Sequence, residues 1–238
     1  MRSSEWVVDH QSRMTRRFEV GVVLLLFVSL GYTCYLWLEA RGGQPTSLQR
    51  INLSISAAQA KAAASMGRPD ADIVFVEFSD YQCPFCGEFS REVHPQIVRD
   101  FVDPGSVRYL YFDFPLEGIH PRARRASEVA NCARSSGRYW LLHHAIFENQ
   151  QAIESDTELF RIARSMGMDE SSLHACMSSD TRSASITADQ SLGRRLGVRS
   201  TPTFMAGRVR PDGSIDLRAM LAGAKPFSQL KEMLAATQ

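Results

Sequence analysis

The most constraining feature of the sequence is an apolar run, IVFVEF at residues 73–78, which a Cys-Pro-Phe-Cys segment follows four residues later. A short run rich in β-branched and aromatic residues is typical of a strand buried on both faces. Residues 84–101 carry apolar side chains at helical spacing, and VRYLYFDF at 107–114 predicts a second strand. Cys83 and Cys86 are therefore expected where a central strand ends and a helix begins, in a parallel strand–helix–strand unit with a right-handed crossover.

Downstream of the second strand, the pattern predicts a helical block followed by a return to strands. Helices are expected at 122–134, 138–150, 156–166, 169–178 and 181–196. The segment STPTFMAG at 200–207 has strand character, and PFSQLKEMLAA at 226–236 predicts a closing helix. We therefore expect one α/β domain over residues 70–238, with a helical insert over about 121–197.

The N-terminal region predicts a membrane anchor. Residues 20–38 contain no charged side chain and, as a helix, are long enough to span a bilayer. Arginines precede this run, so residues 1–19 are expected in the cytoplasm and the remainder of the chain outside the inner membrane, in the periplasm or an equivalent space. A cleaved signal peptide is the alternative. Residues 39–69 begin with the Gly- and Pro-containing RGGQPTS and are expected to form a tether with one short helix.

Charge and cysteine content narrow the classes of function. The 238 residues include 27 basic and 26 acidic side chains, which gives a formal net charge of +1. A protein that binds nucleic acid usually has an excess of basic residues, which this sequence lacks. We therefore do not expect nucleic acid as a partner. If the domain is exported, its cysteines lie in an oxidising compartment, which favours a disulfide over half of a zinc site.

The spacing of the two central cysteines favours redox chemistry. Pro84 suits the first turn of a helix, so Cys83 would face unpaired N–H groups and the positive end of the helix dipole, both of which stabilise a thiolate. Cys86, one turn further along, is then expected to resolve a mixed disulfide at Cys83. A structural disulfide is the alternative. Glu77 interrupts the apolar strand; it is either a surface acid or a buried carboxyl group that relays a proton to Cys86.

Two segments together carry a family resemblance. VEFSDYQCPFC, with a later GVRSTPTFMAG, resembles the thioredoxin-like superfamily, and the helical block between them is similar to that of DsbA-like thiol:disulfide oxidoreductases, in particular the membrane-anchored bacterial branch. The resemblance implies a thioredoxin-like fold with a helical insertion. It implies that Cys83 is the nucleophile, that Cys86 resolves, and that Glu77 is the family's buried acid.

The same resemblance implies a substrate-binding loop. Pro202 is expected in the cis form beside the disulfide, although trans is the default from the sequence alone. Thr201 is expected to offer its backbone to a bound peptide. Phe85 is expected to contact substrate; it occupies the position where strongly oxidising members of the family often have histidine.

These expectations combine into a function. The protein is expected to oxidise exported polypeptides by dithiol–disulfide exchange, and to be reoxidised by a membrane partner linked to quinone, without a cofactor or a resident metal. A reductase or isomerase that uses the same site is one alternative, and a copper-binding delivery protein is another. Cys132 and Cys176 lie on different predicted helices and are expected to form a structural disulfide, with free thiols as the alternative.

Overall fold

The computed structural model describes residues 29–33 and 48–237, which fall into two units, 1–47 and 48–238. Residues 29–33 are helical. The rest of the predicted membrane segment, residues 20–28 and 34–38, lies outside the described residues. Within the described ranges, no helix is long and apolar enough to cross a membrane.

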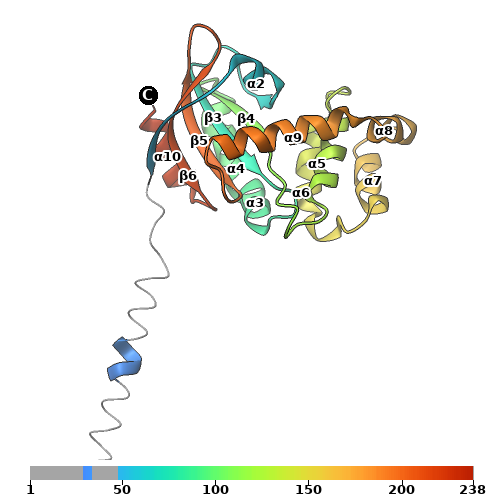
Figure 1. The fold of residues 1–238 in the computed structure, drawn as a ribbon, viewed down its shortest axis with the longest axis horizontal. Coiled ribbons are helices and arrows are strands. Elements are labelled where there is room, and N and C mark those ends of the chain that lie inside the picture. The colour runs from blue at the N-terminus through green and yellow to red at the C-terminus, as the bar shows by residue number, and fades with distance from the viewer. Residues whose placement is uncertain (1–28, 34–47, 238) are drawn as a thin grey trace, which may run out of the picture. The chain divides into compact units, whose positions relative to one another are not determined.

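A mixed β-sheet forms the centre of the second unit (Figure 1). Its described strands are β1 (Gln49–Ile55), β2 (Ala64–Met66), β3 (Ile73–Ser79), β4 (Val107–Asp113), β5 (Thr203–Val209) and β6 (Ile215–Ala222). They follow the order β1-β6-β5-β3-β4-β2. Strand β3 is parallel to β4 and antiparallel to β5, and every residue of β3 is buried. The predicted central strand and its parallel neighbour are confirmed.

The segment expected to be a tether instead contributes to the sheet. Strand β1 pairs antiparallel with β6, and β2 pairs antiparallel with β4, so both edges of the sheet come from residues that precede the predicted domain start at 70. The alternation of Ile51, Leu53 and Ile55 with polar residues gives β1 one apolar side to turn toward the core. The short helix is present as α2 (Ala57–Ala62), and the Ser56 side chain caps it.

The helices agree closely with the sequence pattern. The helix that follows β3 runs through α3 (Pro84–Glu88), η1 (Phe89–Val93), α4 (His94–Ile97) and η2 (Val98–Val102), with two π-helical segments along its length. The insertion contains α5 (Ala123–Cys132), α6 (Tyr139–Glu148), the short 3-10 helix η3 (Gln150–Ala152), α7 (Asp156–Ser165), α8 (Glu170–Met177) and α9 (Asp180–Arg195). Helix α10 (Phe227–Ala235) closes the fold. The five helices expected in the insertion are all found.

The two faces of the sheet bury separate apolar clusters. Phe75 on β3 packs with Tyr109 and Phe204, in a cluster shared with the helix after β3, with α10 and with much of the insertion. Val76 and Phe78 belong to the opposite cluster, which includes apolar residues of α2 and α9. Alternate residues of β3 therefore point to opposite faces, and Glu77 lies on the same face as Phe75.

Candidate active site

The end of β3 and the start of α3 place the two cysteines just beyond the C-terminal end of the central strand. Cys83 is the residue that precedes α3, and Pro84 occupies the first helical position. Both thiols are free and buried, with Cys83 4% exposed and Cys86 fully covered. The loop before β5 approaches from the other side: the Thr201–Pro202 peptide bond is cis, and the Cys83 thiol donates a hydrogen bond to the Thr201 carbonyl at 3.3 Å.

The surroundings of Cys83 favour its thiolate. The pKa of the Cys83 thiol is lowered to about 6, chiefly by a hydrogen bond from the Cys86 side chain, although burial opposes the change. The Thr201 side chain and the backbone N–H groups of Cys86 and Phe85 contribute to the same lowering. These N–H groups belong to the first turn of α3 and lie at the positive end of the helix dipole. An anion at Cys83 is thus stabilised by the helix start on which it lies.

The resolving position has the opposite environment. Burial raises the pKa of the Cys86 thiol well above its usual value, and the neighbouring Cys83 and Glu77 add to this. Glu77 is 2% exposed, and burial raises the pKa of its carboxyl group to about 7. The Tyr109 hydroxyl donates a hydrogen bond to Glu77, which partly offsets that rise. Of the two readings that the sequence left open for Glu77, the structure has the buried carboxyl group.

Asp80 organises the loop before Cys83 and was missed in the sequence. Its carboxylate is fully buried and accepts hydrogen bonds from the backbone N–H groups of Gln82, at 2.7 Å, and Cys83, at 3.2 Å. The second carboxylate oxygen accepts the N–H of Leu116 and pairs with His120 Nδ1, both within 2.8 Å. An Asp between a strand and a helix is typical of such an Asx turn, in which its carboxylate accepts the N–H two residues further on. The position of Asp80 in the sequence could therefore have indicated the turn. Nothing in the neighbouring sequence indicates that Asp80 also contacts residues 116–120.

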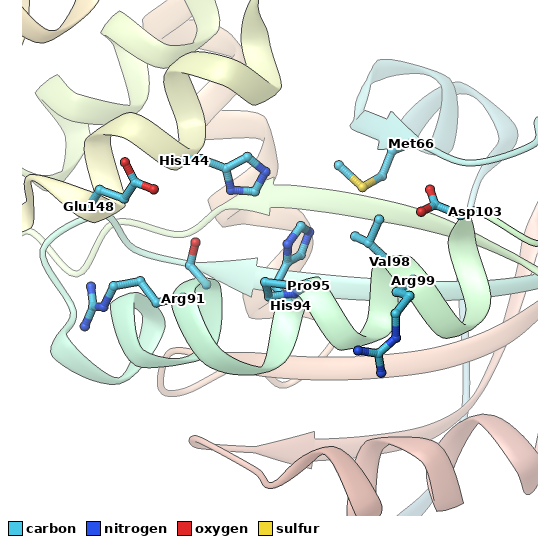
Figure 2. Close-up of a pocket in the computed structure, with 10 residues that line it drawn as sticks. Met66, Arg91, His94, Pro95, Val98, Arg99, Asp103, His144 and Glu148 are labelled. Carbon is cyan, nitrogen blue, oxygen red and sulfur yellow. The ribbon is translucent and has the colours of Figure 1, made fainter.

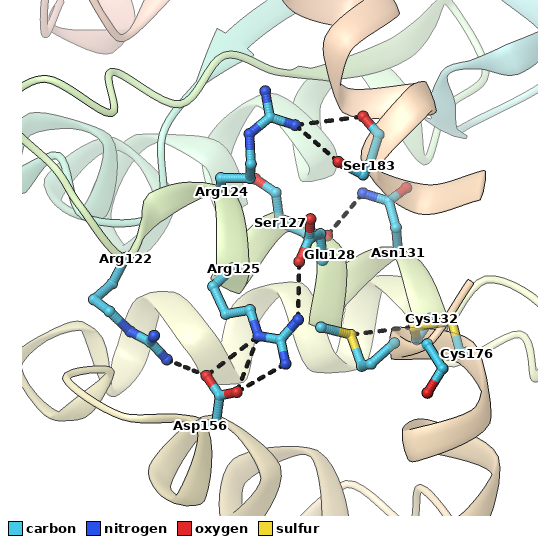
Figure 3. A network of polar contacts seen from close by, with 12 residues as sticks. Arg122, Arg124, Arg125, Ser127, Glu128, Asn131, Cys132, Asp156, Cys176 and Ser183 are labelled. Atoms are coloured by element: carbon cyan, nitrogen blue, oxygen red, sulfur yellow. Dashed lines mark hydrogen bonds and ion pairs between the residues drawn. A yellow bond between two sulfur atoms is a disulfide. The ribbon is translucent and has the colours of Figure 1, made fainter. Parts of the chain in front are cut away.

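Side chains also join this loop to the helical insertion. Gln82 accepts the backbone N–H of Arg122, just before α5, and the Tyr81 hydroxyl lies 2.8 Å from Nδ1 of the buried His143 on α6. Asp156 at the start of α7 pairs with both Arg122 and Arg125 (Figure 3). The loop that carries Cys83 is thereby connected to three helices of the insertion.

The second pair of cysteines lies within the insertion. A disulfide joins Cys132 on α5 to Cys176 on α8 (Figure 3). The sulfur of Met177 lies 3.6 Å from Cys132 Sγ, which gives the bridge an apolar neighbour. The link connects cysteines 44 residues apart in the chain. Cys34, the fifth cysteine, is outside the described residues.

Two further surfaces accompany the dithiol. The Phe85 side chain, between the two cysteines, is 58% exposed although it is a large apolar group. A cavity of about 490 Å³ lies beside α4 and α6 and is lined in part by His94, His144 and Glu148 (Figure 2). In the part of the chain that the structure describes, no group of three or more His, Cys, Asp or Glu side chains is arranged to hold a metal ion.

A dithiol at the start of a helix, opposite a cis-proline loop and on a mixed sheet with a helical insertion, defines a class: proteins of the thioredoxin fold. The sequence profile of the family described as Thioredoxin matches residues 59–222. This match covers more than half of the chain, and the chain belongs to that family. Its fold is the DsbA-like form of the thioredoxin fold: the crystal structure of α-DsbA1 from Wolbachia pipientis superposes with a TM-score of 0.65, at 24% identity, over 73% of this chain and 89% of that one.

Two curated relatives extend the comparison. The chain is 28% identical over 156 residues to the Na(+)/H(+) antiporter NhaA 3 of Salinispora tropica, a match that covers 66% of this chain and 23% of the antiporter. It is 26% identical over 149 residues to disulfide bond formation protein D of Bacillus subtilis, covering 60% of this chain and 67% of that protein. The chain therefore spans about a quarter of the length of the antiporter and two thirds of the length of the second relative.

Proposed function

We propose that this protein is a thiol:disulfide oxidoreductase that acts on exported polypeptides through Cys83 and Cys86, in the oxidising direction. The observation that carries the proposal is the asymmetry of the two thiols. Surrounding hydrogen bonds hold the pKa of Cys83 at about 6, while burial raises that of Cys86 well above its usual value. The sulfur of Cys83 is thus suited both to attack a disulfide and to leave from one. The sulfur of Cys86 is suited to leave only when a proton is supplied to it.

The reaction begins with the oxidised protein, in which Cys83 and Cys86 are joined. A substrate thiolate attacks Cys83 Sγ, a mixed disulfide forms, and Cys86 leaves as a thiolate that takes a proton. Glu77, whose pKa is about 7, is placed to give that proton. A second substrate thiolate then attacks the substrate sulfur of the mixed disulfide and releases Cys83. The substrate loses two electrons, which reduce the Cys83–Cys86 disulfide. The two protons that its thiols lose on ionising pass to solvent, from which Glu77 recovers the proton given to Cys86, and Cys83 is released as a thiolate.

The loop before β5 and the exposed aromatic ring are suited to hold the substrate. Thr201 presents its carbonyl to Cys83. Phe85 offers an exposed apolar side chain between the two cysteines. We assign both residues to binding of an extended, cysteine-containing peptide, with Pro202 packed beside the reacting sulfurs.

The direction of exchange follows from the stability of the reduced form. A stabilised thiolate makes the dithiol more stable and its disulfide more oxidising. A Cys83 pKa of about 6 lies below the pKa of about 7 typical of thioredoxin and above the value of about 3.5 found in the strongly oxidising DsbA. A Cys83 thiol with a pKa well below its ordinary value supports the oxidising direction. Reoxidation then requires a two-electron acceptor, which we assign to a membrane partner linked to quinone.

We also propose that residues 20–38 span the inner membrane, with residues 1–19 in the cytoplasm and the domain on the periplasmic side. The support is the uncharged run itself and the arginines before it. A periplasm-active reporter fused after Gln238 should be active, and full-length protein should stay with membranes after a carbonate wash. A soluble mature chain that begins near Arg41 would instead indicate a cleaved signal peptide.

The function is tested with reduced, unfolded substrate and the purified full-length protein. The oxidised wild type should form substrate disulfides and become reduced, Cys83→Ser should be inactive, and Cys86→Ser should accumulate a mixed disulfide with substrate. The matched control is Cys132→Ser/Cys176→Ser, which removes the other cysteine pair and should keep the exchange reaction. Equal activity of wild type and Cys83→Ser would refute the proposal. A reduction potential as low as about −270 mV, the value for thioredoxin, would refute the oxidising direction.

A further inference from the structure

The insertion sends one side chain to the backbone of the nucleophilic cysteine. Gln150, in η3 just after α6, donates from Nε2 to the carbonyl oxygen of Tyr81 at 2.9 Å and to that of Cys83 at 2.7 Å. The Cys83 carbonyl also accepts the N–H groups of Cys86 and Gly87, each at 3.1 Å, which are the first hydrogen bonds of α3. Gln150 therefore bonds to the same oxygen that starts the helix.

A glycine on α3 leaves room for this contact. Gly87 is buried, and a Cβ atom at this position would lie 2.2 Å from Gln150 Oε1 and 2.8 Å from Arg91 Nη1. Gln150 thus packs directly on the backbone of the first turn of α3. Arg91 makes the reverse connection, since its guanidinium donates to the carbonyl of Phe147, at the end of α6, at 3.1 Å. Gln150 thus reaches from the insertion to the start of α3, and Arg91 reaches from the helix after β3 to the insertion.

We propose that Gln150 is a positioning residue for the exchange reaction. Its side chain, which comes from the helical insertion, holds the backbone of Cys83 so that the N–H groups of the first turn of α3 remain directed toward the Cys83 sulfur. The inference rests on the proposed function of Cys83. Gln150 does not contact the sulfur; it acts through the Tyr81 and Cys83 carbonyls. The insertion consequently sets the reactivity of a thiol that belongs to the thioredoxin part of the fold.

The expected effect follows from what the fixed backbone provides. The N–H groups of Phe85 and Cys86 lower the pKa of Cys83 only while the first turn keeps its orientation. Loss of the Gln150 contacts should raise the Cys83 pKa by about half a unit to one unit, the change expected when a backbone-positioning hydrogen bond is removed. At about 1.4 kcal/mol per pKa unit and per 30 mV, the reduction potential should fall by about 15–30 mV.

The test uses the purified full-length protein with Gln150→Ala, and Gln151→Ala as the matched control. Gln151 is the exposed glutamine next in the same short helix. Thiolate absorbance, corrected with Cys83→Ser, gives the pKa, and a glutathione titration at about pH 8 gives the potential. The Cys83 pKa should rise and the potential fall in Gln150→Ala, while both stay unchanged in Gln151→Ala. A lowered melting temperature with an unchanged pKa and potential would mean a structural contact only, and would overturn the proposal.

A second variant keeps the proposal testable if Gln150→Ala does not fold. Gly87→Ala places a methyl group against Gln150 Oε1 and should displace that side chain, with the same rise in the Cys83 pKa. Combined with Gln150→Ala, it should add little, because the remaining neighbour is the flexible end of Arg91. Additive shifts in the double variant would overturn the proposal. Failure of the wild type to exchange disulfides would overturn the proposed function alone, because the pKa measurement needs no substrate.

Discussion

Replacing Glu77 with Gln should stabilise the protein at alkaline pH and leave its stability at acidic pH almost unchanged. Burial raises the pKa of this carboxyl group from 4.5 to about 7, so the folded state holds a proton that the unfolded chain has already released. The stability of the wild type therefore falls as the pH rises from about 4.5 to about 7. A shift of about 2.5 units, at about 1.4 kcal/mol each, corresponds to roughly 3 kcal/mol at pH 8.

Glutamine keeps the shape of the side chain and an oxygen that accepts the hydrogen bond from Tyr109. The free energy of unfolding would be measured with urea at about pH 5 and about pH 8, in a background with Cys83→Ser and Cys86→Ser to prevent thiol exchange. The variant should gain roughly 3 kcal/mol over its parent at the higher pH and little at the lower one. The matched control, Glu92→Gln, alters an exposed residue of the same charge and should show no such difference.

Equal stabilisation at both pH values would refute the reasoning, because a packing effect does not depend on the charge of Glu77. A loss of stability at about pH 8 would refute it more strongly, since it would mean that the ionised carboxylate is favourably held in the folded state.

Three other outcomes are expected. Phe85→His should lower the Cys83 pKa by about one unit and raise the reduction potential, as measured by thiolate absorbance and glutathione titration; an unchanged potential would contradict this. Burial raises the pKa of Asp189 from 3.8 to about 8, so Asp189→Asn should stabilise the protein by roughly 5 kcal/mol at about pH 8, but not at about pH 4, in urea unfolding. Cys132→Ser/Cys176→Ser should cost up to about 4 kcal/mol of unfolding free energy, and an unchanged urea midpoint would contradict the chain-entropy estimate.

The elements that the sequence predicts well have strong local patterns. Strand β3 is an apolar run interrupted only by Glu77. Helices α5 and α7 have clear amphipathic periodicity, and α7, α8 and α9 each follow a polar residue that caps the first turn. Strand β1 also alternates apolar and polar residues, but it directly follows a Gly- and Pro-containing stretch, and an edge strand buries only one side. Its partner β6 lies at the other end of the chain, so pairing rather than propensity decides its structure.

The difference between local patterns and contacts of distant segments also decides which residues of the site could be predicted. Cys83, Cys86 and Glu77 are readable because they occupy fixed positions along one strand and one helix. Gln150 is not, because its bonds to the carbonyls of Tyr81 and Cys83 join segments more than 60 residues apart, and nothing in its neighbourhood marks it. The physical cause is that a side chain–backbone hydrogen bond between distant segments depends on the packing of the whole insertion.

The place of β5 in the sheet has a consequence for synthesis. Phe75 on β3 pairs with Tyr109 on one side and with Ala206 on the other, so one neighbour leaves the ribosome soon after β3 and the other only after the entire insertion. Until then the central strand of the sheet has an open edge with unpaired backbone groups and an apolar surface, which is a template for association with other chains. A nascent or truncated chain that ends before Thr203 should therefore depend on chaperones far more than the finished protein does.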